Sequence, residues 1–298
     1  MIPEFLVELL KNQYGSELTE KILEGYSTKR KTTFRVNTLK AKVEDIKDIL
    51  ERENIKYENV SWSDEAFILE NLNEDKLRAL DIYKNGEIYL QSLSSMMPPL
   101  ILNPKEDADI LDMAAAPGGK TTQMAALSNN KAHITACEMN NIRLERLKYN
   151  IEKQGASCVY VMQKDSRKID DFFSFDQILL DAPCSGSGTL VASDVNLNKY
   201  FTQKLIEKSV NSQITLLKKA INILKKGSEM IYSTCSILNV ENEDVLRKVM
   251  KEKRVEIVPI ELEETDNLKL LPVSIAGTVC VCPNEYYEGF FIAKLRKI

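Results

Sequence analysis

The chain has 298 residues, of which 44% are hydrophobic and 28% are charged, and its formal net charge is -4. This composition excludes disordered, collagen-like and coiled-coil proteins, and the length allows two domains or one large one. No apolar run approaches the ~18 residues that span a bilayer. The first ten residues contain two glutamates and no basic residue, unlike a signal peptide. We therefore expect a cytoplasmic protein with no membrane partner.

The cysteine pattern argues against disulfides and metals. The six cysteines form no CxxC pair, and only Cys280 and Cys282 lie close together. Such sparse thiols fit a reducing compartment, so we expect no metal site. The acidic net charge argues against a nucleic-acid partner unless basic residues gather in one segment.

The first hundred residues have a mixed α and β pattern. Apolar spacing predicts helices around residues 5–10 and 18–23, a strand over 33–39, a helix over 43–53, and short strands near residues 60 and 68. Residues 29–42 are rich in basic side chains and contain no acid. The segment is therefore a candidate phosphate-contacting face, the alternative being a solvated loop and strand edge. Its candidate RNA contacts are Lys29, Arg30, Lys31, Arg35 and Lys40.

The pattern changes after Gly86, where apolar runs begin to alternate with amphipathic segments. We expect strands over 110–113, 134–137, 159–162, 177–180 and 229–233, and helices from 120, over 141–153 and over 202–224. A closing hairpin is expected over 280–294. This alternation is typical of a doubly wound, Rossmann-like α/β sheet. We place a small α+β domain at residues 1–86 and the α/β domain at residues 87–298.

A turn of small residues follows the first strand of the predicted α/β domain. Residues 112–121 read DMAAAPGGKT and open a predicted helix. Small residues let the backbone approach a ligand closely, and a helix N-terminus favours negative charge. The segment matches neither a P-loop nor GxGxxG. Its size suits the amino-acid end of a cofactor, and the alternative is a tight turn without a ligand.

Acidic residues follow the next two predicted strands. Glu138 ends one strand, where an acid typically accepts hydrogen bonds from ribose hydroxyls. Asp165 follows the next strand, where it can hold an adenine amino group, and Arg143 is placed to pair with Glu138. Each of these residues alone is more often a surface charge. Their regular placement favours S-adenosylmethionine (SAM) over a dinucleotide.

Two further strand ends carry cysteines. Residues 181–188 read DAPCSGSG and residues 232–236 read YSTCS. Ligands bind outside the carboxyl ends of such strands, so Cys184 and Cys235 are expected to face the methyl group of the cofactor. The alternative is two small buried hydrophobic residues, because free cysteine is often buried.

These motifs resemble the Nop/Sun family of SAM-dependent RNA (cytosine-5) methyltransferases. The resemblance covers nearly the whole chain, from FRVNTLK at 34–40 through GEIYLQ at 86–91 to EGFFIAK at 288–294. It implies a SAM-dependent methyltransferase core, an N-terminal RNA-binding domain, Cys235 as the nucleophile and Cys184 as the group that assists product release. The implied cofactor contacts, with Arg143 added as the partner of Glu138, are Ala114, Ala115, Ala116, Pro117, Gly118, Gly119, Lys120, Glu138, Arg143, Asp165 and Asp181.

The chemistry of this family explains the thiols. C5 of cytosine is a weak nucleophile until a thiolate adds at C6, after which C5 can attack the methyl group of SAM. Free cysteine is only a few per cent thiolate at neutral pH, so such a site must favour the anion. Asp181 is suitably placed to bond the N3 edge of the base. The target base must be unstacked to reach a thiol.

The identity of the RNA stays open between rRNA and tRNA. Residues 189–194 read TLVASD where relatives often carry arginines and a His-Pro-Asp segment. Two other functions also stay open: a SAM-dependent methyltransferase for another base, and an RNA-binding ribosome assembly factor without turnover. The sequence does not indicate an oligomeric state, and we favour a monomer.

Overall fold

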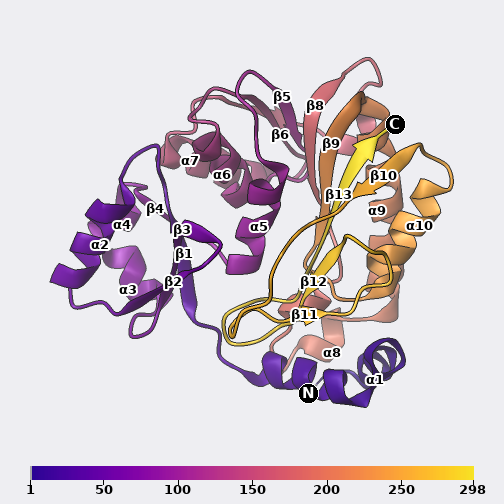
Figure 1. Ribbon diagram of the computed structural model, residues 1–298, viewed down its shortest axis with the longest axis horizontal. Helices are drawn as coiled ribbons and strands as arrows, with labels where there is room; N and C mark the ends of the chain where they lie inside the picture. The colour runs from indigo at the N-terminus through magenta and orange to yellow at the C-terminus, as the bar shows by residue number, and fades with distance from the viewer. Residues whose placement is uncertain (1) are drawn as a thin grey trace. The chain divides into compact units, whose positions relative to one another are not determined.

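The computed structural model describes residues 2–298, which form two compact parts (Figure 1). The continuous part comprises residues 31–166. The discontinuous part combines the first 30 residues with residues 167–298. The N-terminal helix thus belongs with the C-terminal half of the chain. Within residues 2–298, no helix is both long and apolar enough to cross a membrane.

The continuous part begins with a four-stranded antiparallel sheet of order β2-β3-β1-β4. Its strands and helices are β1 (Thr32–Val36), β2 (Tyr57–Val60), β3 (Ser63–Leu69), β4 (Ile88–Leu90), α2 (Val43–Arg52), α3 (Glu74–Ala79) and α4 (Asp81–Lys84). The rings of Phe34 and Phe67 stack with their centroids 5.1 Å apart and belong to the same core as Ile46 and Leu50 of α2. The predicted strand and helix in this segment are confirmed.

Three parallel strands, β5, β6 and β7, complete the continuous part together with three helices. Their bounds are β5 (Asp109–Asp112), β6 (His133–Glu138), β7 (Val159–Gln163), α5 (Leu93–Leu102), α6 (Gly119–Leu127) and α7 (Asn141–Gln154). All but α5 are expected from the sequence. α5 contains Pro98 and Pro99, which normally interrupt a helix, so its sequence does not indicate one.

The discontinuous part contains a mixed sheet in which β8 and β9 are parallel and β13 is antiparallel to β9. β12 and β10 both pair with β13, and β11 pairs with β12. The strands are β8 (Phe175–Asp181), β9 (Leu224–Thr234), β10 (Val255–Val258), β11 (Leu270–Leu271), β12 (Val279–Val281) and β13 (Phe290–Lys297). β12 and β13 form the predicted closing hairpin.

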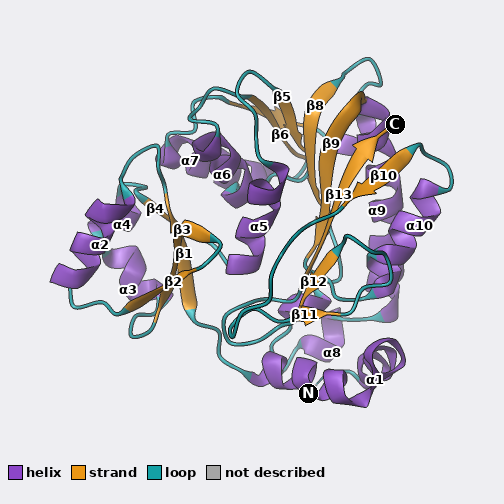
Figure 2. Cartoon of the chain, viewed as in Figure 1, coloured by secondary structure: helices purple, strands orange, loops and turns teal. Residues whose placement is uncertain are grey.

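Helices α1, α8, α9 and α10 accompany these strands (Figure 2). The helical segments are α1 (Glu4–Ser27), α8 (Leu197–Tyr200), α9 (Gln203–Ile223) and α10 (Glu243–Met250), with 3-10 turns η1 (Ser166–Lys168), η2 (Ser187–Thr189) and η3 (Asn239–Glu241). The two apolar stripes predicted near the N-terminus both lie on α1, which kinks at Gly15, where φ is 77°.

α1 is bonded to the loops that follow β8 and β9. Tyr14 donates its hydroxyl to the Ile237 carbonyl at 2.6 Å, and Gln13 donates its amide to the same carbonyl at 2.8 Å. Tyr26 donates to the Ser187 carbonyl at 2.5 Å. The N-terminal helix therefore supports the two loops on which the sequence places the cysteines.

Candidate active site

The turn after β5 is closed by the acid that ends the strand. Asp112 is buried, and its two carboxylate oxygens accept hydrogen bonds from the Thr121 hydroxyl at 2.7 Å and from the Ala114 amide at 3.3 Å. These bonds join the end of β5 to the first turn of α6. The small-residue turn is thus a fixed loop at the N-terminus of a helix.

Two glycines in this turn stand where a side chain would be crowded. Gly118 has a φ of 111°, and a Cβ there would lie 3.1 Å from Leu147 Cδ1. A Cβ on Gly119 would lie 3.1 Å from the Tyr89 ring. A larger residue at either position would have to push its neighbour aside, and the positive φ of Gly118 is a conformation that other residues rarely adopt, so the turn packs closely against Leu147 and Tyr89.

The acid after β6 is linked to the same turn through an arginine. Glu138 is 6% exposed, and its carboxylate accepts from the Asn140 amide at 2.7 Å and lies 3.5 Å from Arg143 Nη1. Arg143 also donates from Nη2 to the Ala116 carbonyl at 2.7 Å. A carboxylate has about four acceptor positions, so Glu138 retains capacity for ribose hydroxyls.

The loop after β7 is tied to the turn as well. Ser166, which follows Asp165, donates its hydroxyl to the Met113 carbonyl at 2.6 Å. Asp165 itself is partly buried. On the other side of the turn, Lys120 Nζ donates to Ser95 Oγ at 2.7 Å. The continuous part therefore gathers around one turn the residues proposed for the cofactor, with Asp181 in the discontinuous part.

Arg35 differs from the surface residue expected of an RNA contact. It is 3% exposed, and its guanidinium donates to Gln91 Oε1 at 2.9 Å, to Thr122 Oγ1 at 2.8 Å and to the Gly119 carbonyl at 3.3 Å. Burial lowers the pKa of this guanidinium to about 10. A guanidinium enclosed in this way supports the start of α6 and is not presented to a phosphate.

Arg35→Met should destabilise the protein by about 2–4 kcal/mol, because it leaves buried acceptors without their donor. Lys40→Met, at an exposed position in the same basic segment, should change the stability by less than about 0.5 kcal/mol. Urea unfolding of the two variants measures the difference. Equal stabilities would contradict the structural role of Arg35.

The discontinuous part brings the predicted catalytic residues together at two strand ends. Ser233 donates its hydroxyl to Asp181 Oδ1 at 2.8 Å, and the Ala182 amide donates to the Ser233 carbonyl at 2.8 Å. Because β8 and β9 end side by side, the turns after them place the Sγ atoms of Cys184 and Cys235 only 3.0 Å apart. Both thiols are partly exposed.

Close backbone contacts hold the loop after Cys184. The Gly188 amide donates to the Cys235 carbonyl at 2.9 Å, and the Gly289 amide donates to the Gly188 carbonyl at 2.8 Å. A Cβ on Gly188 would lie 1.9 Å from the Gly289 carbonyl oxygen. Gly188 therefore lets the loop after β8 approach the backbone just before β13.

The two thiols interact electrostatically. The pKa of the Cys184 thiol is raised well above its ordinary value, first by its hydrogen bond with Cys235 and then by burial, with further contributions from the charges of Cys235 and Glu241. Cys184 is therefore held as a neutral thiol at neutral pH. A neutral thiol can donate a proton to a neighbouring thiolate and is unsuited to acting as the nucleophile.

Cys235→Ala should lower the pKa of Cys184 toward its ordinary value, because it removes the principal cause of the rise. A lower pKa gives more thiolate at a given pH, so iodoacetamide should modify Cys184 at lower pH in the variant. Mass spectrometry of the modified peptides over a pH series measures this shift. Cys158, whose raised pKa has burial as its principal cause, is the internal control and should not change. An unchanged profile for Cys184 would contradict the coupling.

Sequence reasoning missed a buried carboxylate beside the thiols. Glu241 has 0% exposure and accepts hydrogen bonds from residues that directly follow both cysteines. Its sequence context, Glu241-Asn242-Glu243-Asp244, is typical of acids at the start of a helix. No signal in the sequence distinguishes it from Glu243 and Asp244.

The other predicted RNA contacts differ in their environment. Lys29 and Lys40 are exposed, and Lys31 is partly exposed. Arg30 is partly buried, and its guanidinium lies 3.4 Å from the Thr189 carbonyl and 3.3 Å from the Leu190 carbonyl, both of which accept its hydrogen bonds. Arg30 thus supports the loop that departs from the family pattern.

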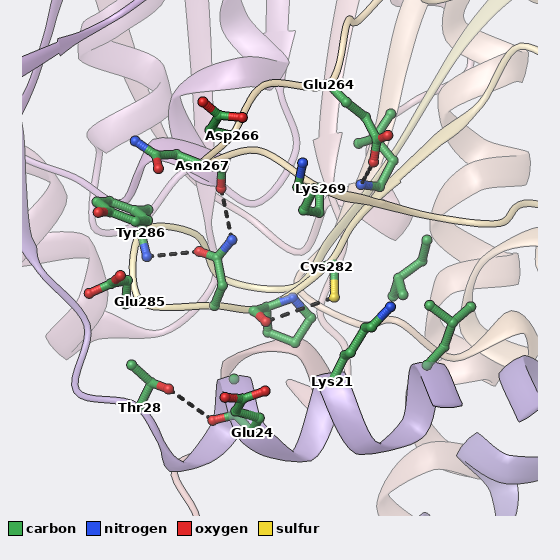
Figure 3. A pocket seen from close by; sticks show the side chains of 16 residues that line it. Lys21, Glu24, Thr28, Glu264, Asp266, Asn267, Lys269, Cys282, Glu285 and Tyr286 are labelled. Carbon is green, nitrogen blue, oxygen red and sulfur yellow. Dashed lines mark hydrogen bonds between the residues drawn. The ribbon is translucent and has the colours of Figure 1, made fainter. Parts of the chain in front are cut away.

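A separate hollow of about 570 Å³ lies between α1 and residues 264–286 (Figure 3). Its lining carries both charges, with Lys21 and Lys269 among Glu24, Asp266 and Glu285. It includes none of the residues predicted to bind the cofactor or to act in catalysis, and so it is distinct from the thiol pair.

Comparison with known proteins identifies the class. A crystal structure of a methyltransferase homolog protein from Pyrococcus horikoshii is 32% identical, with a TM-score of 0.83 and full coverage of both chains. A crystal structure of NSun6 from Pyrococcus horikoshii with SFG is 25% identical, with a TM-score of 0.86, and the match covers 99% of this chain and 98% of that one. The fold is that of a Rossmann-like methyltransferase, as predicted.

The family models are more specific. The model of the 16S rRNA methyltransferase RsmB/F matches residues 99–296, and that of the RsmF/B-like, ferredoxin-like domain matches residues 2–74. The chain belongs to the RsmB/F methyltransferase family, which confirms the resemblance seen in the sequence. The probable ribosomal RNA small subunit methyltransferase B of Bacillus subtilis is 30% identical over 301 residues, covering 99% of this chain and 66% of that protein. The chain spans between about half and two thirds of the length of the curated relatives it matches.

Proposed function

We propose that the chain is a SAM-dependent RNA (cytosine-5) methyltransferase that acts on ribosomal RNA through a covalent adduct with Cys235. The observation that carries the proposal is the pair of thiols 3.0 Å apart at neighbouring strand ends, next to Asp181. Methyl transfer to an amino nitrogen needs no thiol, whereas the C5 carbon of cytosine requires one. The names of the curated relatives, which refer to small-subunit ribosomal RNA, support rRNA as the substrate.

The turn in the continuous part supports SAM as the methyl donor. The backbone of residues 114–120 would hold its amino-acid end, Glu138 its ribose and Asp165 its adenine. The fit rests on the helix N-terminus into which the turn leads and on the remaining acceptor capacity of Glu138. SFG, named with the NSun6 structure, is a SAM analogue. When bound, SAM supplies an electrophilic methyl group.

The chain's own residues would carry the remaining chemistry. The Cys235 thiolate adds to C6 of the cytosine, which makes C5 nucleophilic. Asp181 bonds the N3 edge and stabilises the charge of the adduct. In the adduct the Cys235 sulfur is a thioether, which removes the main cause of the raised pKa of Cys184. After the methyl group is transferred, the Cys184 thiolate accepts the C5 proton. The electrons of the C5–H bond form the C5–C6 double bond, and the bond between Cys235 and C6 breaks to release the Cys235 thiolate.

RNA contact is proposed for the exposed lysines of the basic segment. Lys29, Lys31 and Lys40 belong to residues 1–86, which we propose as the RNA-binding module beside the methyltransferase domain at 87–298. Their charges would contact phosphates without reading sequence. Arg30 and Arg35 are left out of this set, because both side chains are at least partly buried and donate to acceptors within the protein. Lys40 also donates to the Asn85 carbonyl at 3.0 Å, but it is exposed.

Product analysis tests the proposed function. The full chain is incubated with labelled SAM and total RNA from cells that lack the gene, and the nucleosides are identified by mass spectrometry. We expect 5-methylcytidine in small-subunit rRNA. 5-Methylcytidine found in tRNA would mean that tRNA, and not rRNA, is the substrate. A different methylated base would mean that the chain catalyses a different methyl transfer. RNA binding without methylation of rRNA or of assembly intermediates would favour an assembly factor.

A further inference from the structure

Glu241 is a fully buried carboxylate that the proposed mechanism does not use. It lies at the end of η3, six residues after Cys235, with 0% exposure. Within residues 2–298 its carboxylate takes part in hydrogen bonds and in no ion pair. Burying a carboxylate is unfavourable in free energy unless several hydrogen-bond donors compensate it. We therefore consider what its donors connect.

Its hydrogen bonds join the two cysteine turns. Oε1 accepts from the Ser185 amide at 2.7 Å and from Gln213 Nε2 at 3.2 Å. Oε2 accepts from the Ser185 hydroxyl at 2.5 Å and from the Ser236 hydroxyl at 2.6 Å. Ser185 directly follows Cys184, and Ser236 directly follows Cys235. One carboxylate therefore holds the residue next to each thiol.

The carboxylate oxygens of Glu241 also set the direction of the neighbouring hydrogen bonds. Ser236 gives its single hydroxyl proton to Glu241, so it accepts from the Leu238 amide at 3.2 Å and from Ser187 Oγ at 2.8 Å. Ser187 in turn accepts from the Ile237 amide at 3.0 Å. A Gln side chain at this position would break this order, because its amide nitrogen is a donor and would stand where one of two accepting oxygens is needed.

Gln213 gives an independent sign that the cluster is built around the carboxylate. Its amide nitrogen donates to Glu241 and to the Pro183 carbonyl at 3.1 Å. Its buried Oε1 is left without a hydrogen-bond partner among residues 2–298. Leaving a buried acceptor unpaired is unfavourable, and this orientation is the one that serves Glu241 and the residue before Cys184.

We propose that Glu241 is a positioning residue that holds the thiols of Cys184 and Cys235 in contact by binding the turns that carry them. The inference rests on the proposed function for its consequence in catalysis, and on the hydrogen bonds for the thiol contact itself. Misplacement of a reacting group by about 1 Å can cost about 100-fold in rate. A substitution at Glu241 should therefore change the distance between the two thiols and the rate of any reaction that needs them in contact.

The test measures the thiol contact without any substrate. Diamide, a diazene oxidant, converts two adjacent thiols to a disulfide and is itself reduced to the hydrazine, taking up the two thiol protons and two electrons. Mass spectrometry then gives the rate at which the Cys184–Cys235 disulfide forms in the folded full chain. Glu241→Gln should lower this rate about tenfold or more. Glu243→Gln, a buried carboxylate two residues on that bonds Ser274, is the matched control and should leave it unchanged.

Catalysis is then measured on the same variants. In Glu241→Gln, kcat for methyl transfer should fall about 100-fold while KM for SAM stays within about twofold, because the turn around Gly118 is not altered. Glu241→Asp should restore part of the rate. If Glu241→Gln does not fold, Ser236→Ala should show the same loss in both assays, because it removes the hydroxyl that links Glu241 to the turn of Cys235.

Two results would overturn the proposal. One is disulfide formation at the wild-type rate in folded Glu241→Gln, and the other is an equal loss in Glu243→Gln. Because the oxidation assay needs neither RNA nor SAM, it tests the role of Glu241 even if the protein does not methylate cytosine. A failure of the proposed function is seen separately, as the absence of 5-methylcytidine with the wild-type chain.

Discussion

Replacing Cys235 with alanine should lower the rate of methyl transfer to cytosine by at least about a thousandfold. Without the Cys235 thiolate at C6 the C5 carbon stays a weak nucleophile, and Cys184 follows a different strand, β8, so its sulfur does not occupy the position from which Cys235 attacks C6. Initial rates with labelled SAM measure the effect. Binding of SAM should not change.

The matched control for this variant is Cys158→Ala. Cys158 is a partly buried cysteine that precedes β7 in the continuous part. Its replacement should leave methyl transfer within about twofold of the wild type. Methyl transfer that survives the loss of Cys235 would mean that another group is the nucleophile.

Cys184→Ala should allow methyl transfer but slow product release by about 100-fold or more, so that protein linked to RNA accumulates. The Sγ atom of Cys184 lies 3.0 Å from that of Cys235, within reach of the base that Cys235 would hold. Without it, the adduct should lose its C5 proton slowly and the thioether should persist. A denaturing gel detects the labelled adduct.

The double variant Cys184→Ala/Cys235→Ala gives the control for this experiment. It should form no adduct, because the nucleophile is absent. Rapid turnover by Cys184→Ala without an adduct would assign the release step to another residue and would remove Cys184 from the mechanism.

The thiol pair could be predicted from sequence because it depends on regular structure. Cys184 and Cys235 each follow an apolar run by a few residues, and parallel strands end at the same edge of a sheet. The positions of the strands in the sequence are therefore sufficient to predict that the two thiols lie close together.

Arg35 and Glu241 show where that reasoning ends. A charged residue between Phe34 and Val36 indicates a strand with one solvated face, yet both faces of β1 are covered and Arg35 is buried. Glu241 resembles the exposed Asp244 in sequence, and its carboxylate bonds Ser185, 56 residues away. Contacts across such distances follow from packing and not from local pattern.

The sequence also does not indicate with which part of the chain α1 packs. The chain order suggests that the first 86 residues act as one unit, whereas the first 30 residues pack with residues 167–298. Tyr14 and Tyr26 bond carbonyls beside the cysteine turns. Apolar periodicity predicts a helix but does not say which core the helix joins.

The central claim is that Cys235 forms a bond to C6 of a cytosine, and peptide mapping of the trapped adduct tests it most directly. Cys184→Ala protein is incubated with SAM carrying a labelled methyl group and with RNA that lacks 5-methylcytidine, then digested with nuclease and protease. We predict a labelled peptide in which a 5-methylated cytidine is attached to Cys235. A methylated cytidine attached to any other residue, or methylated RNA that never links to the protein, would contradict the account.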